Sequence, residues 1–199
     1  MIGPVVHGPA VLSKVMLLGQ APGPREGSFG RPFAWTAGKT MFGWFEKAFG
    51  IDEATFRRKV YIAAVARCFP GKAQGGGDRR PDAEEIAACR TFLEREVAIL
   101  EPHLVIAVGQ LAISEVLGEV AKKKKLEDLV GHVFPASWHG QSVAVLPLPH
   151  PSGASPWHKL EPGKRLLTKA LSVAKRHPAM REIIEGAQGR GSSARSAAS

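Results

Sequence analysis

Residues 15–33 read VMLLGQAPGPREGSFGRPF, an apolar run that leads directly into a loop rich in glycine and proline. The run from Val15 to Leu18 contains no polar residue, which is typical of a short strand buried on both faces. The glycines and prolines that begin at Gly19 exclude a regular helix or strand over the rest of the stretch. This segment therefore predicts a buried strand that ends in a loop of defined shape.

Apolar runs of the same kind recur downstream at residues 60–65, 104–108 and 143–146, and a turn follows each of them. Between the runs, residues 41–49, 86–100, 110–120 and 166–174 have the apolar period of a helix. Asp82 with Glu85 three positions later is typical of a capping box. Because strands and helices alternate, the pattern predicts a three-layer α/β/α sandwich around a mostly parallel sheet of about four strands.

The composition fits one compact domain, since the 199 residues are 44% hydrophobic and 23% charged. We expect this domain to span residues 1–188, followed by a disordered basic tail over residues 189–199. No apolar run reaches the roughly 20 residues that a membrane helix needs, so we expect a cytoplasmic protein. A monomer is the default expectation.

The formal net charge is +9, and most of it lies outside the tail, which favours a polyanionic partner such as nucleic acid. The two cysteines are too few for the four thiolates of a usual iron–sulfur or structural zinc site. We therefore expect reduced thiols, no metal and no cofactor.

In an open parallel sheet, ligands bind beyond the carboxyl ends of the strands. Gln20 and Glu26 lie in the loop after the first strand, and His150 follows the last one. The turn of small residues after His150 favours a loop that faces an anion over a histidine buried in the core. The first loop has neither GxGxxG spacing nor a GK[ST] ending, which argues against a nucleotide-binding loop.

These segments resemble the uracil-DNA glycosylase superfamily. GQAPG followed by GRPF, and HPSG far downstream, are similar to its two signature motifs, in the same order. VYIAAVARCFPG and EIAACRTFLEREVAILEPHLVIAVG are similar to the central part of the family 4, iron–sulfur type. The similarity runs from about Val15 to His158.

The resemblance implies a DNA glycosylase that flips uracil out of DNA, hydrolyses its glycosidic bond and leaves an abasic site for base-excision repair. It implies that Phe33 stacks on uracil and that His150 supplies a hydrogen bond to the departing base. Gln20 and Glu26 compete for the role of activating water. The expected substrate-binding residues are Gly19, Gln20, Ala21, Phe33 and Ala64.

For contacts to the DNA backbone we expect helix N-termini, small-residue turns and cations. The expected residues are Lys39, Arg79, Arg80, Ser152, Gly153, Ser155, Trp157 and Lys159. The glycine-rich loop from Gly71 to Pro81, which carries the two arginines, is expected to close on the DNA backbone.

The sequence also departs from the family 4 pattern. Only Cys68 and Cys89 occupy positions of the four cluster cysteines, so we expect no cluster and two thiols that lie close together. Ala64 stands where an asparagine reads uracil, which leaves two alternatives: other groups read the base, or the pocket is less selective. Because Ala21 also replaces a functional side chain, a non-catalytic or weakly catalytic module that binds damaged or abasic DNA is the rival hypothesis.

Overall fold

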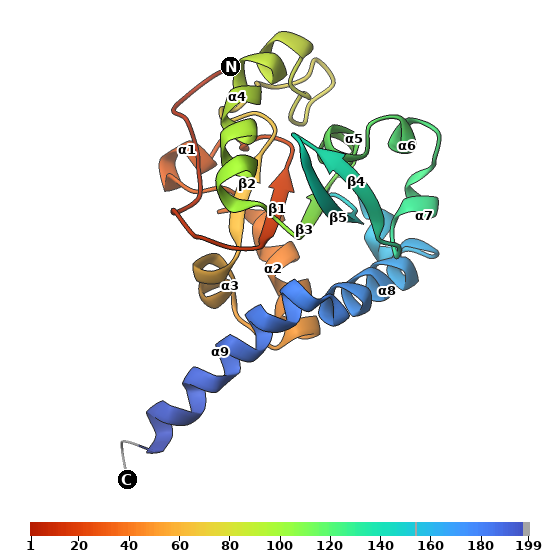
Figure 1. The fold of residues 1–199 in the computed structure, drawn as a ribbon. Helices are drawn as coiled ribbons and strands as arrows, with labels where there is room; N and C mark the ends of the chain where they lie inside the picture. Colours follow the sequence, from red (N-terminus) through yellow and green to blue (C-terminus); the bar gives the residue numbers. More distant parts are fainter. Residues whose placement is uncertain (154, 197–199) are drawn as a thin grey trace.

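The computed structural model describes residues 1–153 and 155–196, and its description of side chains ends at residue 188. Five strands form one sheet in the order β2-β1-β3-β5-β4 (Figure 1). They are β1 (Val15–Gly19), β2 (Tyr61–Ala64), β3 (Leu104–Val108), β4 (Phe134–Trp138) and β5 (Gln141–Leu148). The pairs β1–β2, β1–β3 and β3–β5 are parallel, so the predicted mostly parallel sheet is confirmed.

Strand β4 is the one that the sequence pattern did not predict, and it pairs antiparallel with β5 at the edge of the sheet. It contains Pro135, which an edge strand tolerates because one side of its backbone needs no partner. His139 and Gly140 connect the two strands and both have positive φ, 46° and 79°, as the tight two-residue turn of a hairpin requires.

Helices cover both faces of the sheet (Figure 1). The α-helices are α1 (Glu26–Phe29), α2 (Thr36–Phe49), α3 (Glu53–Lys59), α4 (Ala83–Leu100), α5 (Gln110–Leu117), α6 (Glu119–Lys122), α7 (Leu126–Leu129), α8 (Gly163–Arg176) and α9 (Pro178–Ser196), and a short 3-10 helix, η1 (Pro156–Lys159), precedes α8. The predicted helix over 110–120 is interrupted at Gly118, whose φ of 51° ends α5 before α6 begins.

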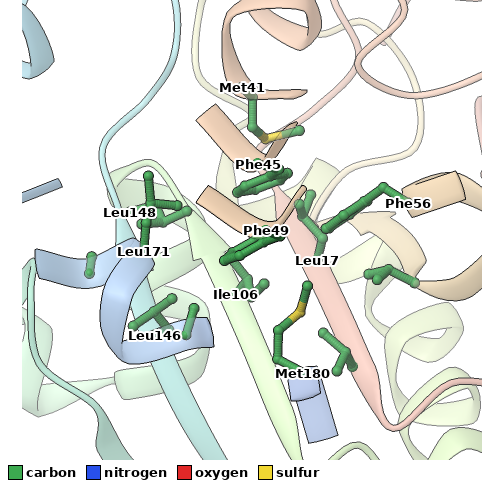
Figure 2. Close-up of a cluster of buried hydrophobic side chains, with 14 of the residues drawn as sticks. Leu17, Met41, Phe45, Phe49, Phe56, Ile106, Leu146, Leu148, Leu171 and Met180 are labelled. Carbon is green, nitrogen blue, oxygen red and sulfur yellow. The ribbon is translucent and has the colours of Figure 1, made fainter. Parts of the chain in front are cut away.

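Figure 2 shows the core on the first face, where α2, α3, α8 and α9 pack against the sheet. Phe45 lies at its centre and stacks on Phe49 and Phe56, with ring centroids 5.5 and 4.7 Å apart. These three rings are 1% exposed or less, so this face anchors α2 and α3 firmly to the sheet.

The second face is covered by α4 and α5 together with the short helices α6 and α7. Helix α4 begins at the predicted capping box, in which Asp82 accepts from the Glu85 backbone N–H at 2.9 Å. The Glu85 carboxylate in turn accepts from the Asp82 N–H at 3.0 Å. This reciprocal pair fixes where the long loop after β2 ends.

The chain ends in α9, which Figure 1 shows as a blue helix that extends away from the sheet. It overlaps the expected disordered tail, because the helix continues to Ser196. Residues 197–199 lie outside the described residues, so the extent of the tail stays a prediction. In the part of the chain that the structure describes, no helix is both long and apolar enough to cross a membrane.

Candidate active site

A pocket of about 480 Å³ lies at the carboxyl ends of the parallel strands. The loops after β1, β2 and β5 form its walls. The first two loops are tied together, since the N–H groups of Val65 and Ala66 donate to the carbonyls of Gly19 and Gln20, each at 3.0 Å. This is the edge at which an open α/β sheet binds its ligand, and the volume is typical of a small-molecule pocket.

Phe33 lines this pocket and has an unusual backbone, with a positive φ of 54°. A Cβ on Gly19 would lie 2.6 Å from Cζ of Phe33, so the ring rests directly against the end of β1. A Cβ on Gly38 would lie 1.7 Å from the Phe33 carbonyl oxygen. The two glycines therefore define the space for this residue, and its strained backbone is typical of a functional position.

Arg57, in the last turn of α3, hydrogen-bonds to the backbone of the segment that contains Phe33. Its guanidinium donates to the carbonyl oxygens of Pro32 and Phe33, both at 2.9 Å, and to the Glu53 carboxylate at 2.8 Å. It also lies 4.5 Å from the centre of the Phe42 ring. Arg57 is 7% exposed, the bond to Pro32 is buried and the other two are partly buried, and together they help to hold Phe33 in its left-handed conformation.

Glu26 begins α1 and is also buried, with 7% of the residue exposed. Its carboxylate accepts from the Gly23 backbone N–H at 3.4 Å and from backbone groups of Phe33 and Ala34. Burial raises its pKa, and these hydrogen bonds together with nearby Arg57 partly oppose the rise. Glu26 lines the pocket and joins the two ends of the first loop.

His150 follows β5 and lines the opposite wall of the pocket. The Ser152 backbone N–H donates to Nδ1 of His150 at 3.3 Å, which leaves Nε2 as the nitrogen that carries hydrogen in the neutral ring. Burial lowers the pKa of His150, and the negative charge of Asp78 opposes this in part. The imidazole is therefore neutral at neutral pH and presents an N–H donor.

The other sequence-based substrate residues converge on the same pocket. Gln20 and Ala21 follow Gly19 along one wall, and Ala64 ends β2 beside them. Ala64 is 5% exposed and contributes a methyl group and its backbone, so its side chain offers no hydrogen bond to a base. The pocket thus brings together predicted site residues that lie up to 131 positions apart, from Gly19 to His150, and their roles stay predictions.

Asp78 is a pocket residue that the sequence reasoning missed. It lies in the loop after β2, where its Oδ1 accepts from Lys72 at 2.6 Å. Its Oδ2 would lie 3.7 Å from a Cβ on Gly23, which places it beside the first loop. The signal was faint, because one carboxylate within a run of glycines and arginines is usually a solvated turn residue.

The expected DNA-binding residues divide into two groups. Arg79, Arg80 and Ser152 line the pocket. The others lie outside its lining: Lys39, Gly153, Ser155, Trp157 and Lys159. Lys39, Gly153 and Lys159 are exposed and remain accessible to a phosphate, while Ser155 is half-buried.

Two of these residues are more constrained than the sequence suggests. Arg79 forms an ion pair with Glu85, with Nη1 2.8 Å from Oε2, and it also lies 3.6 Å from Asp82. Trp157 packs against the first core at the start of α8, where a Cβ on Gly163 would lie 2.0 Å from its carbonyl oxygen. Both therefore have structural partners in the fold, beside any role at DNA.

The two cysteines do not fit an iron–sulfur cluster, which needs four thiolates. Burial raises the pKa of Cys68, and the nearby Cys89 raises it further, so the neutral thiol is favoured over the metal-binding thiolate. The segment beside Cys68 is paired with the chain start, since Val6 donates to Arg67 and Ile2 to Phe69, both at 2.7 Å. Within the described residues, no three histidine, cysteine or acidic side chains are grouped to hold a metal ion.

The fold and pocket define an α/β protein with a ligand-sized pocket at the carboxyl edge of its sheet. Comparison with known proteins agrees: the family described as Uracil DNA glycosylase superfamily matches residues 5–175. The chain therefore belongs to the uracil-DNA glycosylase superfamily.

Individual relatives are named uracil-DNA glycosylases. The type-4 uracil-DNA glycosylase of Saccharolobus solfataricus is 28% identical over 165 residues, which is 80% of this chain and 72% of that protein. The type-4 enzyme of Thermotoga maritima is 32% identical over 70% of this chain and 65% of its own length. The type-5 enzyme of Pyrobaculum aerophilum is 33% identical over 67% of this chain and 63% of its own length. The chain thus spans roughly two thirds of the length of these relatives.

Proposed function

We propose that this protein is a monofunctional uracil-DNA glycosylase that hydrolyses the bond between uracil and deoxyribose and leaves an abasic site. Membership in the superfamily and the type-4 relatives support glycosylase activity on uracil in DNA. The observation that carries the proposal is the convergence of Phe33 and His150 on one pocket, from opposite ends of the sequence.

In this proposal the uracil nucleotide leaves the duplex, because a base stacked between its neighbours cannot enter a pocket at the ends of the strands. Phe33 then lies against the face of the base. Gly19 lies against the ring, and Arg57 hydrogen-bonds to the Phe33 backbone, so the ring keeps its position. A preformed aromatic surface of this kind stacks on a base at little cost in reorganisation.

Cleavage breaks the bond between C1′ of the sugar and N1 of uracil, and the electron pair leaves with the base. We assign His150 to stabilise the resulting anion through Nε2–H, which is supported by the bond that the Ser152 N–H donates to Nδ1. A neutral donor suits this role, since it holds the anion without first having to gain a proton. The lowered pKa of His150 supports this assignment.

Water completes the reaction at C1′, and it needs an oxygen nearby to accept its proton. The sequence proposes Gln20 or Glu26, and the pocket adds Asp78. The Glu26 carboxylate already accepts from three backbone groups, whereas one oxygen of Asp78 pairs with Lys72 and the other borders the pocket. We therefore assign the water to Asp78, with Gln20 as a hydrogen-bond partner and Glu26 as the residue that organises the loop.

Position 64 carries no asparagine that could hydrogen-bond to uracil. We propose that backbone groups near Gly19 and the side chain of Gln20 recognise the base instead, since the Gln20 amide both donates and accepts hydrogen bonds. A polar side chain disfavours the wrong base because the wrong base leaves that side chain without a hydrogen-bond partner. The methyl group of Ala64 has no such effect, so the selectivity of the pocket for uracil over other bases is reduced. We infer that other deaminated bases, such as hypoxanthine, also enter the pocket.

For the DNA backbone we propose contacts from Arg80, Lys39 and Lys159 and from the turn of Ser152, Gly153 and Ser155. The pocket lining itself holds four cations, Arg25, Lys72, Arg79 and Arg80, against two acids, Glu26 and Asp78. This excess of positive charge supports a site at which the glycine-rich loop approaches phosphate. A cytoplasmic monomer remains the expectation from the sequence.

The hydrolytic, monofunctional assignment can be tested directly. Lys72 lines the pocket, and a lysine amine is the nucleophile of bifunctional glycosylases. Its ammonium donates to the Asp78 carboxylate at 2.6 Å, and the proposal gives this lysine no role as a nucleophile. Borohydride should therefore trap no covalent complex with abasic DNA. A trapped complex that disappears in Lys72→Met would show a lyase instead.

The deciding experiment incubates the protein, in excess chelator, with labelled oligonucleotides that carry one uracil or one hypoxanthine, followed by alkaline cleavage. Strand scission at uracil establishes a glycosylase that needs no added metal, and scission at both bases establishes the permissive pocket. Absence of scission with retained binding to abasic DNA supports the rival damage-binding module, for which the alanines at positions 21 and 64 are the supporting observation.

A further inference from the structure

Two large aromatic side chains are exposed beside the pocket. Phe29, at the end of α1, is 48% exposed, and Trp35, just before α2, is 38% exposed. Their rings stack on each other with centroids 5.8 Å apart and planes inclined by 26°. We call this pair, with the cations around it, the aromatic platform.

The platform does not belong to either hydrophobic core, since neither ring is among the residues that build or border them. Apolar rings of this size usually contribute to stability by burial. Here a large part of both rings faces solvent, although Phe33, two positions before Trp35, packs against the core. An exposed apolar patch next to a pocket is typical of a binding surface.

Cations surround the platform. The guanidinium of Arg25 lies 4.5 Å from the centre of the Trp35 ring, and the Lys39 ammonium lies 5.9 Å from it. Among the ion pairs of the described residues, none involves Arg25 or Lys39. Their charges are therefore available to an anionic ligand.

The platform is continuous with the pocket, because Arg25 and Trp35 are both among the pocket-lining residues. A ligand on the Trp35 ring would therefore lie next to one that occupies the pocket. Aromatic faces combined with unpaired cations are the pattern by which proteins hold single-stranded nucleic acid: rings stack on bases and cations bind phosphates.

We propose that the aromatic platform binds an unpaired nucleobase that neighbours the excised nucleotide, and that it thereby favours single-stranded DNA. A base within a duplex has both faces covered by its neighbours, so the platform can stack only on an unpaired one. The identity of the DNA as substrate rests on the proposed function, but binding to the platform does not require catalysis.

The test compares the affinities of wild-type protein and variants for a uracil-free single strand and for the matching duplex, by fluorescence anisotropy. Trp35→Ala should lower the single-stranded to double-stranded affinity ratio by about tenfold, and Phe29→Ala by somewhat less. Trp35→Phe, which keeps an aromatic face, should recover most of the ratio. Phe92→Ala is the matched control, because Phe92 is 47% exposed on α4 and belongs neither to the platform nor to the pocket lining.

A second readout is direct. Of the four tryptophans, Trp35 is the exposed one, so stacking on a base should quench its fluorescence, and that quenching should be lost in Trp35→Phe. Thermal unfolding midpoints that match wild type would show that the variants are folded. An unchanged affinity ratio in folded Trp35→Ala would overturn the proposal. So would a change limited to self-association in sedimentation, which would make the patch a contact between copies.

Failure of this inference can be distinguished from failure of the proposed function. Uracil excision with an unchanged affinity ratio in Trp35→Ala leaves the glycosylase standing and removes the platform. A reduced ratio without excision of any base leaves the platform standing and removes the glycosylase.

Discussion

The guanidinium of Arg57 donates to the carbonyl oxygen of Phe33 at 2.9 Å, so a residue on α3 holds the backbone of the ring that faces the pocket. This bond links α3 to the loop after β1, between residues 24 positions apart, and it is partly buried. The site thus depends on a cation that never reaches the substrate.

Arg57→Met should weaken both the fold and the site. Each carbonyl left without its donor costs about 1–3 kcal/mol of unfolding free energy, measured in urea. Single-turnover excision should slow while affinity for uracil-free duplex stays constant, because the loss concerns the position of Phe33. Arg57→Lys, which keeps one charged donor, should recover part of the rate. An unchanged rate in Arg57→Met would remove Arg57 as a positioning residue.

Gly19→Ala tests the contact between β1 and the Phe33 ring. The added Cβ would lie 2.6 Å from Cζ of Phe33, so the ring must move away. Excision should fall by about 100-fold, the cost that a misplacement of about 1 Å commonly carries. Gly43→Ala is the matched control, since its Cβ meets nothing within 4 Å on the surface of α2. Equal rates for the two variants would contradict the assigned contact.

His150→Ala should slow excision by about 100-fold at preserved folding, the usual effect of losing one donor to developing charge. The sign of the pH dependence follows from its lowered pKa: the ring gains its proton at lower pH than an ordinary histidine, whose pKa is 6.5, so the neutral form predominates at pH 7 and above. The difference in log rate between wild type and His150→Ala should therefore stay constant from pH 8 down to about 7.5. A change of that difference within this window would show that the ring titrates there.

Asp78→Asn and Glu26→Gln separate the two carboxylates. Loss of a general base costs about two orders of magnitude or more, so Asp78→Asn should slow single-turnover excision by that amount. Glu26→Gln should mainly lower the urea midpoint, because the amide replaces an acceptor of three backbone groups. If Glu26→Gln instead removes activity in a protein of wild-type stability, the base is Glu26, as the sequence motif suggested.

The two arginines of the glycine-rich loop should behave differently. Arg80→Ala should weaken DNA binding and reduce the slope of log affinity against log salt by about one. Arg79→Ala should lower the unfolding midpoint as well, because Arg79 is bonded to Glu85 at the start of α4. If the double variant binds DNA with unchanged affinity and salt slope, the loop does not contact phosphate.

Much of the fold could be predicted from the sequence because hydrophobic periodicity and helix capping act over short stretches of the chain. Apolar runs and helical periods located β1, β2, β3 and β5, and the Asp82–Glu85 box located the start of α4. Strand β4 was not predicted because it is a half-exposed edge strand that contains a proline, and its pairing depends on a turn with two positive φ angles. A search for apolar periodicity detects neither an edge strand of this kind nor the backbone angles of its turn.

The candidate site followed a similar division. The sequence by itself determined that loops rich in small residues follow buried strands, and the sheet rule places the carboxyl ends of such strands at one edge. Only the tertiary structure decided which side chains face the pocket. It brought in Asp78, paired Arg79 with Glu85 and packed Trp157 against the core. Local pattern follows from backbone sterics and hydrophobic period, whereas these contacts depend on how segments distant in the sequence pack together.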